Sequence, residues 1–173
     1  MRLPRLAAPL MFAAALALTL APSARAAVPA VAQATPTDVY KVEIERDISL
    51  TDAADSMRLR ANALNLKLVA EMPLSKQVEV MTGTTERTIT IFQFCDAVTA
   101  RDLIALNLDF SVYMPCRIAL IEDADGRGWL VMMDVNVDAV AKEKRLPQAL
   151  KVRIEAVRQA LVEIMQAGAS GAL

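Results

Sequence analysis

The chain of 173 residues is long enough for one domain and a targeting segment. Its composition, 55% hydrophobic and 23% charged, excludes a disordered chain, and its formal net charge of −1 provides no basic excess for binding a nucleic acid. Aromatic residues are scarce, at 4%, and methionines are frequent, at 9, so we expect an aliphatic core of adaptable shape.

The N-terminal 26 residues have the features of a secretory signal peptide. Arg2 and Arg5 are basic, an apolar run follows over 6–20, and Ala24-Arg25-Ala26 is the small-x-small pattern that signal peptidase recognises. The alternative is an uncleaved membrane anchor, but the run is shorter than the roughly 20 residues that a transmembrane helix needs. We therefore expect cleavage before Ala27, export to a bacterial periplasm, and no stable membrane anchor.

The first half of the mature chain alternates between strand and helix patterns. Residues 27–37 are small and contain two prolines, which predicts a flexible leader. Polar and apolar residues alternate over 39–45, as in a strand with one wet face, and again over 66–72. Between them, 50–64 carries an apolar stripe at helical spacing. We expect a single domain over 38–167 that begins with these elements.

The second half predicts three more strands and two more helices. The strands are expected at 88–94, 116–122 and 129–135, the last two joined by an Asp- and Gly-rich turn. The helices are expected at 96–106 and from Pro147 to about 167, before a disordered tail over 168–173. Residues 74–87 and 136–144 are ambiguous, with room for a helical turn in each. In the first of these segments Ser75 is a candidate N-cap and Gly83 a candidate helix end.

The resulting order, β-α-β-β-α-β-β-α, predicts the α+β class. Helices on one face of a mostly antiparallel sheet of about five strands bury the apolar stripes most simply. The alternating first strand fits an edge or an open face, and the fifth strand, apolar on both faces, fits the middle of the sheet.

The two cysteines, Cys95 and Cys116, are the main candidates for unusual chemistry, because the chain has no histidine. In an exported protein two cysteines favour a disulfide. A reversible thiol pair or a covalent carrier is the second hypothesis, because a helix N-terminus near Cys95 and the charge of Arg117 would lower the thiol pKa. A soft Cu(I) site using Met114 is the third. We predict no metal or other cofactor.

Four segments form a recognisable set: the helix at 50–64, Ile91-Phe92-Gln93-Phe94-Cys95-Asp96, Met114-Pro115-Cys116-Arg117-Ile118, and the acidic turn 122–126 followed by Trp129. Together they resemble the domain-of-unknown-function 302 family. The resemblance implies a curved antiparallel sheet comparable to the TATA-binding-protein fold, and no established activity. Antiparallel strands would place both thiols at the same end of the sheet. Many members have a Gly-Asn-Pro-like segment where this chain has Phe94-Cys95-Asp96, so the cysteine pair belongs to this chain or to an exported subgroup.

The function expected from the sequence is a non-enzymatic, exported binding or interaction domain. Its partner would be a small apolar or sulfur-containing ligand or another protein, with a homodimer left open. The alternative is a periplasmic thiol, redox or sulfur-carrier protein that uses Cys95 and Cys116. No catalytic residue is predicted, and we take Arg117, Asp96 and Met114 as candidates for tuning the thiols or contacting a ligand.

Overall fold

The structure is a computed structural model that describes residues 38–172. The expected signal peptide, its cleavage site and the leader 27–37 lie outside these residues. The strands are β1 (Asp38–Glu43), β2 (Lys67–Pro73), β3 (Ile89–Cys95), β4 (Cys116–Glu122) and β5 (Gly128–Asp134). The helices are α1 (Leu50–Ala63), α2 (Leu74–Thr82), α3 (Ala97–Leu106), the 3-10 helix η1 (Leu108–Tyr113), α4 (Val137–Glu143) and α5 (Gln148–Ser170).

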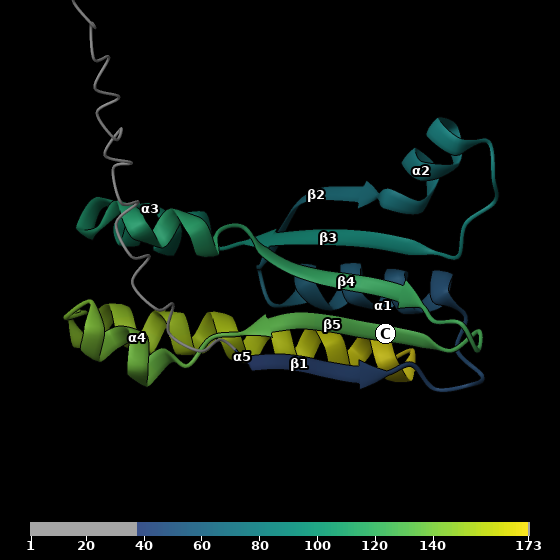
Figure 1. Ribbon diagram of the computed structural model, residues 1–173. Coiled ribbons are helices and arrows are strands. Elements are labelled where there is room, and N and C mark those ends of the chain that lie inside the picture. The colour runs from purple at the N-terminus through teal and green to yellow at the C-terminus, as the bar shows by residue number, and fades with distance from the viewer. Residues whose placement is uncertain (1–37, 173) are drawn as a thin grey trace, which may run out of the picture. The chain divides into compact units, whose positions relative to one another are not determined.

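The five strands form one antiparallel sheet in the order β1-β5-β4-β3-β2 (Figure 1). The predicted α+β class and five-stranded antiparallel sheet are therefore confirmed. β1 lies at an edge, as its alternating pattern predicted. We expected β5 in the middle of the sheet, but the central strand is β4. β5 is an inner strand, with β1 on one side and β4 on the other.

Successive side chains of a strand point to opposite faces of the sheet. One face is covered by α1 and α5, which lie behind the sheet in Figure 1. Its buried residues form the main core with apolar side chains of both helices; they include Phe92, Phe94, Ile118, Leu130 and Met132. The other face of the sheet presents the alternate residues, and those near its centre are half-buried: Ile91, Ala119 and Val131.

α1 and α5 approach closely at Gly168, where a side chain would not fit. A Cβ atom at this position would lie 2.6 Å from Met57 Cγ and 2.9 Å from Leu130 Cδ1. We expected a disordered tail from Gly168 onward, but α5 continues to Ser170 with Gly168 and Ala169 buried. The helix ends at Gly171, whose φ of 66° is the left-handed conformation that suits a helix C-terminus.

A second, smaller core lies beyond the end of the sheet where β3 and β5 finish. Leu103 of α3, Phe110 of η1 and Val140 of α4 are buried in it, and Leu150 and Ile154 of α5 pack against them. The apolar stripe of α5 thus serves two cores, one under the sheet and one outside it. This outer core was not predicted, because the sequence patterns of η1 and α4 are short and ambiguous.

The ambiguous segment 74–87 contains α2, which Gly83 ends with a φ of 71°, as we expected. The expected cap at Ser75 is wrong, because Pro73 occupies the N-cap position. The buried Ser75 hydroxyl instead accepts a hydrogen bond from Ile89 N at 3.2 Å and donates one to Ile89 O at 3.4 Å. Ser75 therefore joins α2 to the start of β3. Among the described helices, none has the length and apolar character needed to cross a membrane.

Candidate functional site

A cavity of about 350 Å³ lies where β3 ends, β4 begins and β5 ends. In Figure 1 this is the end of the sheet from which α3 and α4 extend. The lining is mainly apolar and is drawn from both faces of the sheet and from the outer core, including Leu103, Phe110, Val140, Ile154, Val157 and Val131. Because residues of both faces contribute, the cavity passes around the ends of these strands.

All five candidate residues from the sequence line this cavity. They are Cys95, Asp96, Met114, Cys116 and Arg117. Cys95 ends β3 and Cys116 begins β4, and these strands are antiparallel, so both thiols are at the same end of the sheet. The five residues therefore lie together at one cavity.

The expected disulfide is not formed, and both cysteines are free thiols. The reason lies in the register of the two strands: Cys116 is directly opposite Phe94, whose ring is buried in the main core. Directly opposite residues point to the same face, so Cys95, one residue further along β3, points to the other face. A shared end of the sheet was therefore necessary for a disulfide but not sufficient.

The electrostatic environment does not activate either thiol. Burial, and to a lesser degree the Asp96 carboxylate, raises the pKa of Cys95. Burial, followed by the proximity of Cys95, raises the pKa of Cys116 to about 11, although Arg117 acts in the opposite direction. We expected Arg117 and the helix N-terminus to lower these values, but desolvation is the larger effect. Both thiols are therefore protonated at neutral pH.

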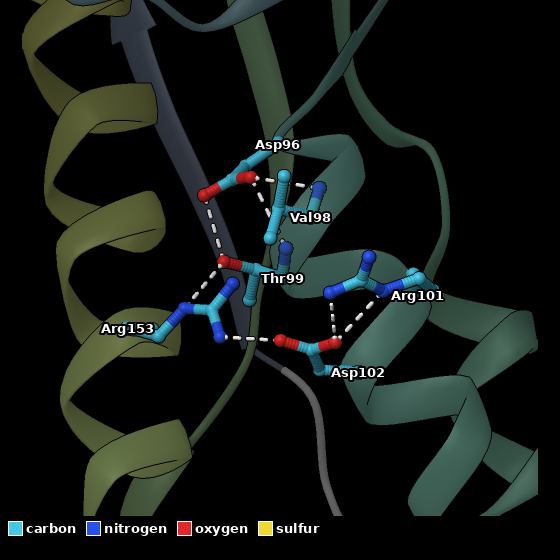
Figure 2. A network of polar contacts seen from close by, with 6 residues as sticks. All are labelled: Asp96, Val98, Thr99, Arg101, Asp102 and Arg153. Carbon is cyan, nitrogen blue, oxygen red and sulfur yellow. Dashed lines mark hydrogen bonds and ion pairs between the residues drawn. The ribbon is translucent and has the colours of Figure 1, made fainter.

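Asp96 is the N-cap of α3 and is held by several hydrogen bonds (Figure 2). Its Oδ2 accepts a hydrogen bond from Thr99 Oγ1 at 2.7 Å, and its Oδ1 accepts from Val98 N and Thr99 N, both at 3.1 Å. The bond from the Thr99 hydroxyl is the largest of the effects that lower the pKa of Asp96, and the charge of Arg153 adds to them. Asp96 is thus an ionised, structurally engaged carboxylate at the cavity.

The same network fastens α3 to α5. Arg153 donates from Nε to Thr99 Oγ1 at 3.0 Å and from Nη1 to Asp102 Oδ2 at 2.7 Å. Figure 2 shows Arg153 reaching from α5 to both side chains, with Arg101 on the far side of Asp102. Arg101 donates to Asp102 Oδ1 at 2.9 and 2.7 Å. One wall of the cavity therefore has fixed polar supports.

A second ion pair supports the cavity from β5. Arg158 of α5, a lining residue, donates from Nε and Nη2 to the two carboxylate oxygens of Asp134 at 2.7 and 2.9 Å. This bond raises the pKa of Arg158. In residues 38–172 no group of three or more His, Cys, Asp or Glu side chains is arranged to hold a metal ion.

The sequence did not identify the polar supports of the cavity. Thr99 follows Asp96 by three residues, a spacing at which a hydroxyl can reach an N-cap carboxylate, so a local signal for it existed. Arg153 and Arg158 had no such signal, because their partners are 51 or 54 and 24 residues away. Such distant pairs become visible only when the packing of α5 is known.

Comparisons with known proteins point to one family. A family model described as "Domain of unknown function DUF302" matches residues 40–168. The fold is similar to the crystal structure of an uncharacterized conserved protein DUF302 from Bacillus stearothermophilus, with a TM-score of 0.60, 12% sequence identity, and coverage of 75% of this chain and 96% of that chain. At this identity the similarity concerns the fold. A search of curated proteins found no match.

Proposed function

The chain belongs to the family described as Domain of unknown function DUF302, and for this member we propose a non-enzymatic domain that binds a small apolar ligand. The binding site is the cavity at the ends of β3, β4 and β5. Its volume of about 350 Å³ carries the proposal, because it reaches the range of roughly 300–1,000 Å³ that small-molecule sites occupy. The mainly apolar lining with a few polar groups is also typical of such sites.

The sulfur atoms of the lining favour the same class of ligand. Five sulfur-containing residues contribute to it: Cys95, Met114, Cys116, Met132 and Met133. Methionine thioethers are polarisable, adapt to irregular apolar shapes and make favourable contacts with aromatic groups, and protonated cysteines behave as small apolar groups. An apolar small molecule, with or without a sulfur-containing group, is therefore the ligand class that we propose.

The chemical groups at the cavity support binding rather than catalysis. Nucleophilic and redox thiols act as thiolates, whereas burial raises the pKa of Cys95 and raises that of Cys116 to about 11. Asp96 accepts three hydrogen bonds, so it has little capacity left to act as a general base. The alternative of a thiol, redox or sulfur-carrier protein has less support than ligand binding.

The proposal includes the compartment. We propose that the domain acts in a bacterial periplasm after cleavage of the signal peptide before Ala27. The support is the sequence of the N-terminal 26 residues, with its basic start, apolar run and Ala24-Arg25-Ala26 motif.

Octan-1-ol is a suitable first probe of the binding site. Isotope-labelled methionine methyl groups would be observed by NMR during its titration. The signals of Met114, Met132 and Met133 should shift, because these residues line the cavity, while that of Met81, which is 86% exposed on α2, should not. Absence of any shift at the three lining methionines would reject the proposed site.

A pair of matched variants tests whether the cavity itself is responsible. Ala119→Phe places a ring on the open face of β4, within the lining, and should weaken octan-1-ol binding. Ala70→Phe makes the same change on β2, outside the lining, and should leave binding unchanged. Equal effects of the two substitutions would contradict the assignment of the site.

A further inference from the structure

We infer that the ligand of this cavity carries a carboxylate head group, which Arg117 binds while the apolar body of the ligand lies among the lining residues. This inference rests on the proposed function and specifies its ligand. It comes from the distribution of charges around the cavity, where Arg117 is the one lining arginine that has no ion pair within residues 38–172.

Arg117 lies at the border between the cavity and solvent. It is the second residue of β4, opposite Gln93 of β3, and its side chain is therefore on the open face of the sheet. It lines the cavity and is also exposed. A guanidinium in this position can bind a group at the cavity entrance while its aliphatic part contacts the apolar lining.

The other charged groups at the cavity are compensated within the protein. Arg158 is bound by both oxygens of Asp134, at 2.7 and 2.9 Å. Asp96 caps α3 and accepts the Thr99 hydroxyl, and Arg153 lies close enough for its charge to lower the pKa of that carboxyl. Asp96 is therefore not available for a cationic ligand, whereas Arg117 retains its capacity for an anionic one.

A carboxylate is the anion that best matches this arrangement. Its two oxygens pair with the planar guanidinium through two parallel hydrogen bonds, and its single charge balances that of Arg117. A phosphate monoester carries a larger negative charge, which the single guanidinium of Arg117 does not balance. An amphipathic monocarboxylate, with an apolar chain or ring system, satisfies both the cavity and its cation.

Calorimetric titrations of octanoate, octan-1-ol and octyl phosphate test this inference. For the native domain, octanoate should bind about tenfold more tightly than octan-1-ol, as expected for a charge-assisted hydrogen-bonded pair. Arg117→Gln should weaken octanoate binding about tenfold and leave octan-1-ol binding unchanged. Arg117→Lys, which keeps the charge but not the planar fork, should lie between the two.

Arg87→Gln is the matched control. Arg87 is also an exposed arginine without a hydrogen bond or ion pair within residues 38–172, but it precedes β3 at the opposite end of that strand and is not part of the lining. This substitution removes the same charge and should leave the affinity for octanoate unchanged. Thermal unfolding of each variant would establish that it is folded before titration.

The outcomes separate the inference from the proposed function. If octan-1-ol and octanoate bind equally and Arg117→Gln changes neither affinity, the inference is overturned and the apolar binding site stands. Tighter binding of octyl phosphate than of octanoate overturns the choice of a carboxylate. If neither octan-1-ol nor octanoate binds or shifts the methionine signals, the proposed function fails and the inference fails with it. Loss of octanoate binding in both Arg117→Gln and Arg87→Gln would overturn the specific role of Arg117.

Discussion

Cys116 lies directly opposite Phe94 on the neighbouring strand, and both residues contact the main core. This pairing turns Cys116 toward α1 and α5 and leaves Cys95, the next residue after Phe94, on the open face. The two thiols therefore lie at the same end of the sheet but point to its opposite faces. Their chemistry therefore follows from burial rather than from mutual bonding.

The first prediction concerns the reactivity of Cys116. Iodoacetamide reacts with thiolates, so Cys116 should be alkylated slowly at neutral pH, and its rate should rise until the pH reaches about 11. Cys95→Ser leaves Cys116 as the only thiol and allows its rate to be measured by mass spectrometry.

The same shift predicts a loss of stability at high pH. The folded pKa of Cys116 is raised from 9.0 to about 11, so its neutral form stabilises the fold below pH 9.0, and this contribution declines between the two values. Urea unfolding of Cys116→Ser should show a weaker decline over this range. Alkylation of native Cys116 at neutral pH as fast as that of an unfolded peptide would contradict the raised pKa on which both expectations depend.

The second prediction concerns Thr99, which joins Asp96 to Arg153. Thr99 is 3% exposed, and Thr99→Val keeps its shape but removes the hydrogen bonds of 2.7 and 3.0 Å to these two partners. Leaving partly buried polar groups unsatisfied should lower the free energy of unfolding by about 1–3 kcal/mol. Urea denaturation monitored by circular dichroism would measure it.

Thr85→Val provides the control for this substitution. Thr85 is exposed and has no hydrogen bond within the described part of the chain, so the change should be within about 0.5 kcal/mol. If Thr99→Val has an effect no larger than Thr85→Val, the network does not hold α3 to α5 as described.

The third prediction concerns Asp123 in the turn between β4 and β5. Its carboxylate accepts hydrogen bonds from Trp129 Nε1 at 2.8 Å and from the backbone N of Asp125 and Arg127 at 2.9 and 3.0 Å. The bond from Trp129 is the largest cause that lowers its pKa to about 2. The contribution of Asp123 to stability is therefore complete above pH 3.8 and declines as the pH falls toward about 2.

Asp123→Ala should lower the urea midpoint at neutral pH, and the difference from the native domain should become smaller as the pH approaches about 2. Asp125→Ala serves for comparison, because the Asp125 side chain is 76% exposed and makes one ion pair with Arg127 at 3.3 Å. A difference for Asp123→Ala that stays constant over this pH range would show that the carboxylate is not responsible.

The fourth prediction concerns processing and oxidation state. Intact-mass spectrometry of the protein recovered from a bacterial periplasm should give a mass that begins at Ala27, because Ala24-Arg25-Ala26 is the cleavage motif. The mass should correspond to two free thiols, in line with the opposite faces of Cys95 and Cys116. A mass that retains residues 1–26 would contradict cleavage, and the loss of two hydrogens from the monomer would contradict the free thiols.

The sequence predicted those features that depend on neighbouring residues. The strand at 116–122 was predicted with the bounds that β4 has, and the core-facing positions of α1 and of much of α5 followed from helical spacing. The helix expected at 96–106 agrees with α3, whose N-cap is Asp96.

Features that depend on register and long-range packing were not predictable. Whether Cys95 faces Cys116 depends on how residues 96–115 fold, because a change of one residue in register reverses the faces. η1 and α4 pack in the outer core, whose residues come from separate parts of the chain, including α3 and α5. Local sequence patterns could not predict these two helices, because their packing partners are distant in the sequence. The shift of thiol pKa also depended on burial that no spacing could reveal.

The close contact between Gly168 and Met57 has a consequence for how related sequences diverge. With 2.6 Å between Met57 Cγ and a Cβ atom at 168, a larger residue at 168 is compatible with this helix spacing only if position 57 becomes smaller. The two positions should therefore covary among relatives that keep the α1–α5 pair. A relative with alanine at position 168 and a residue smaller than methionine at position 57 would show that exchange.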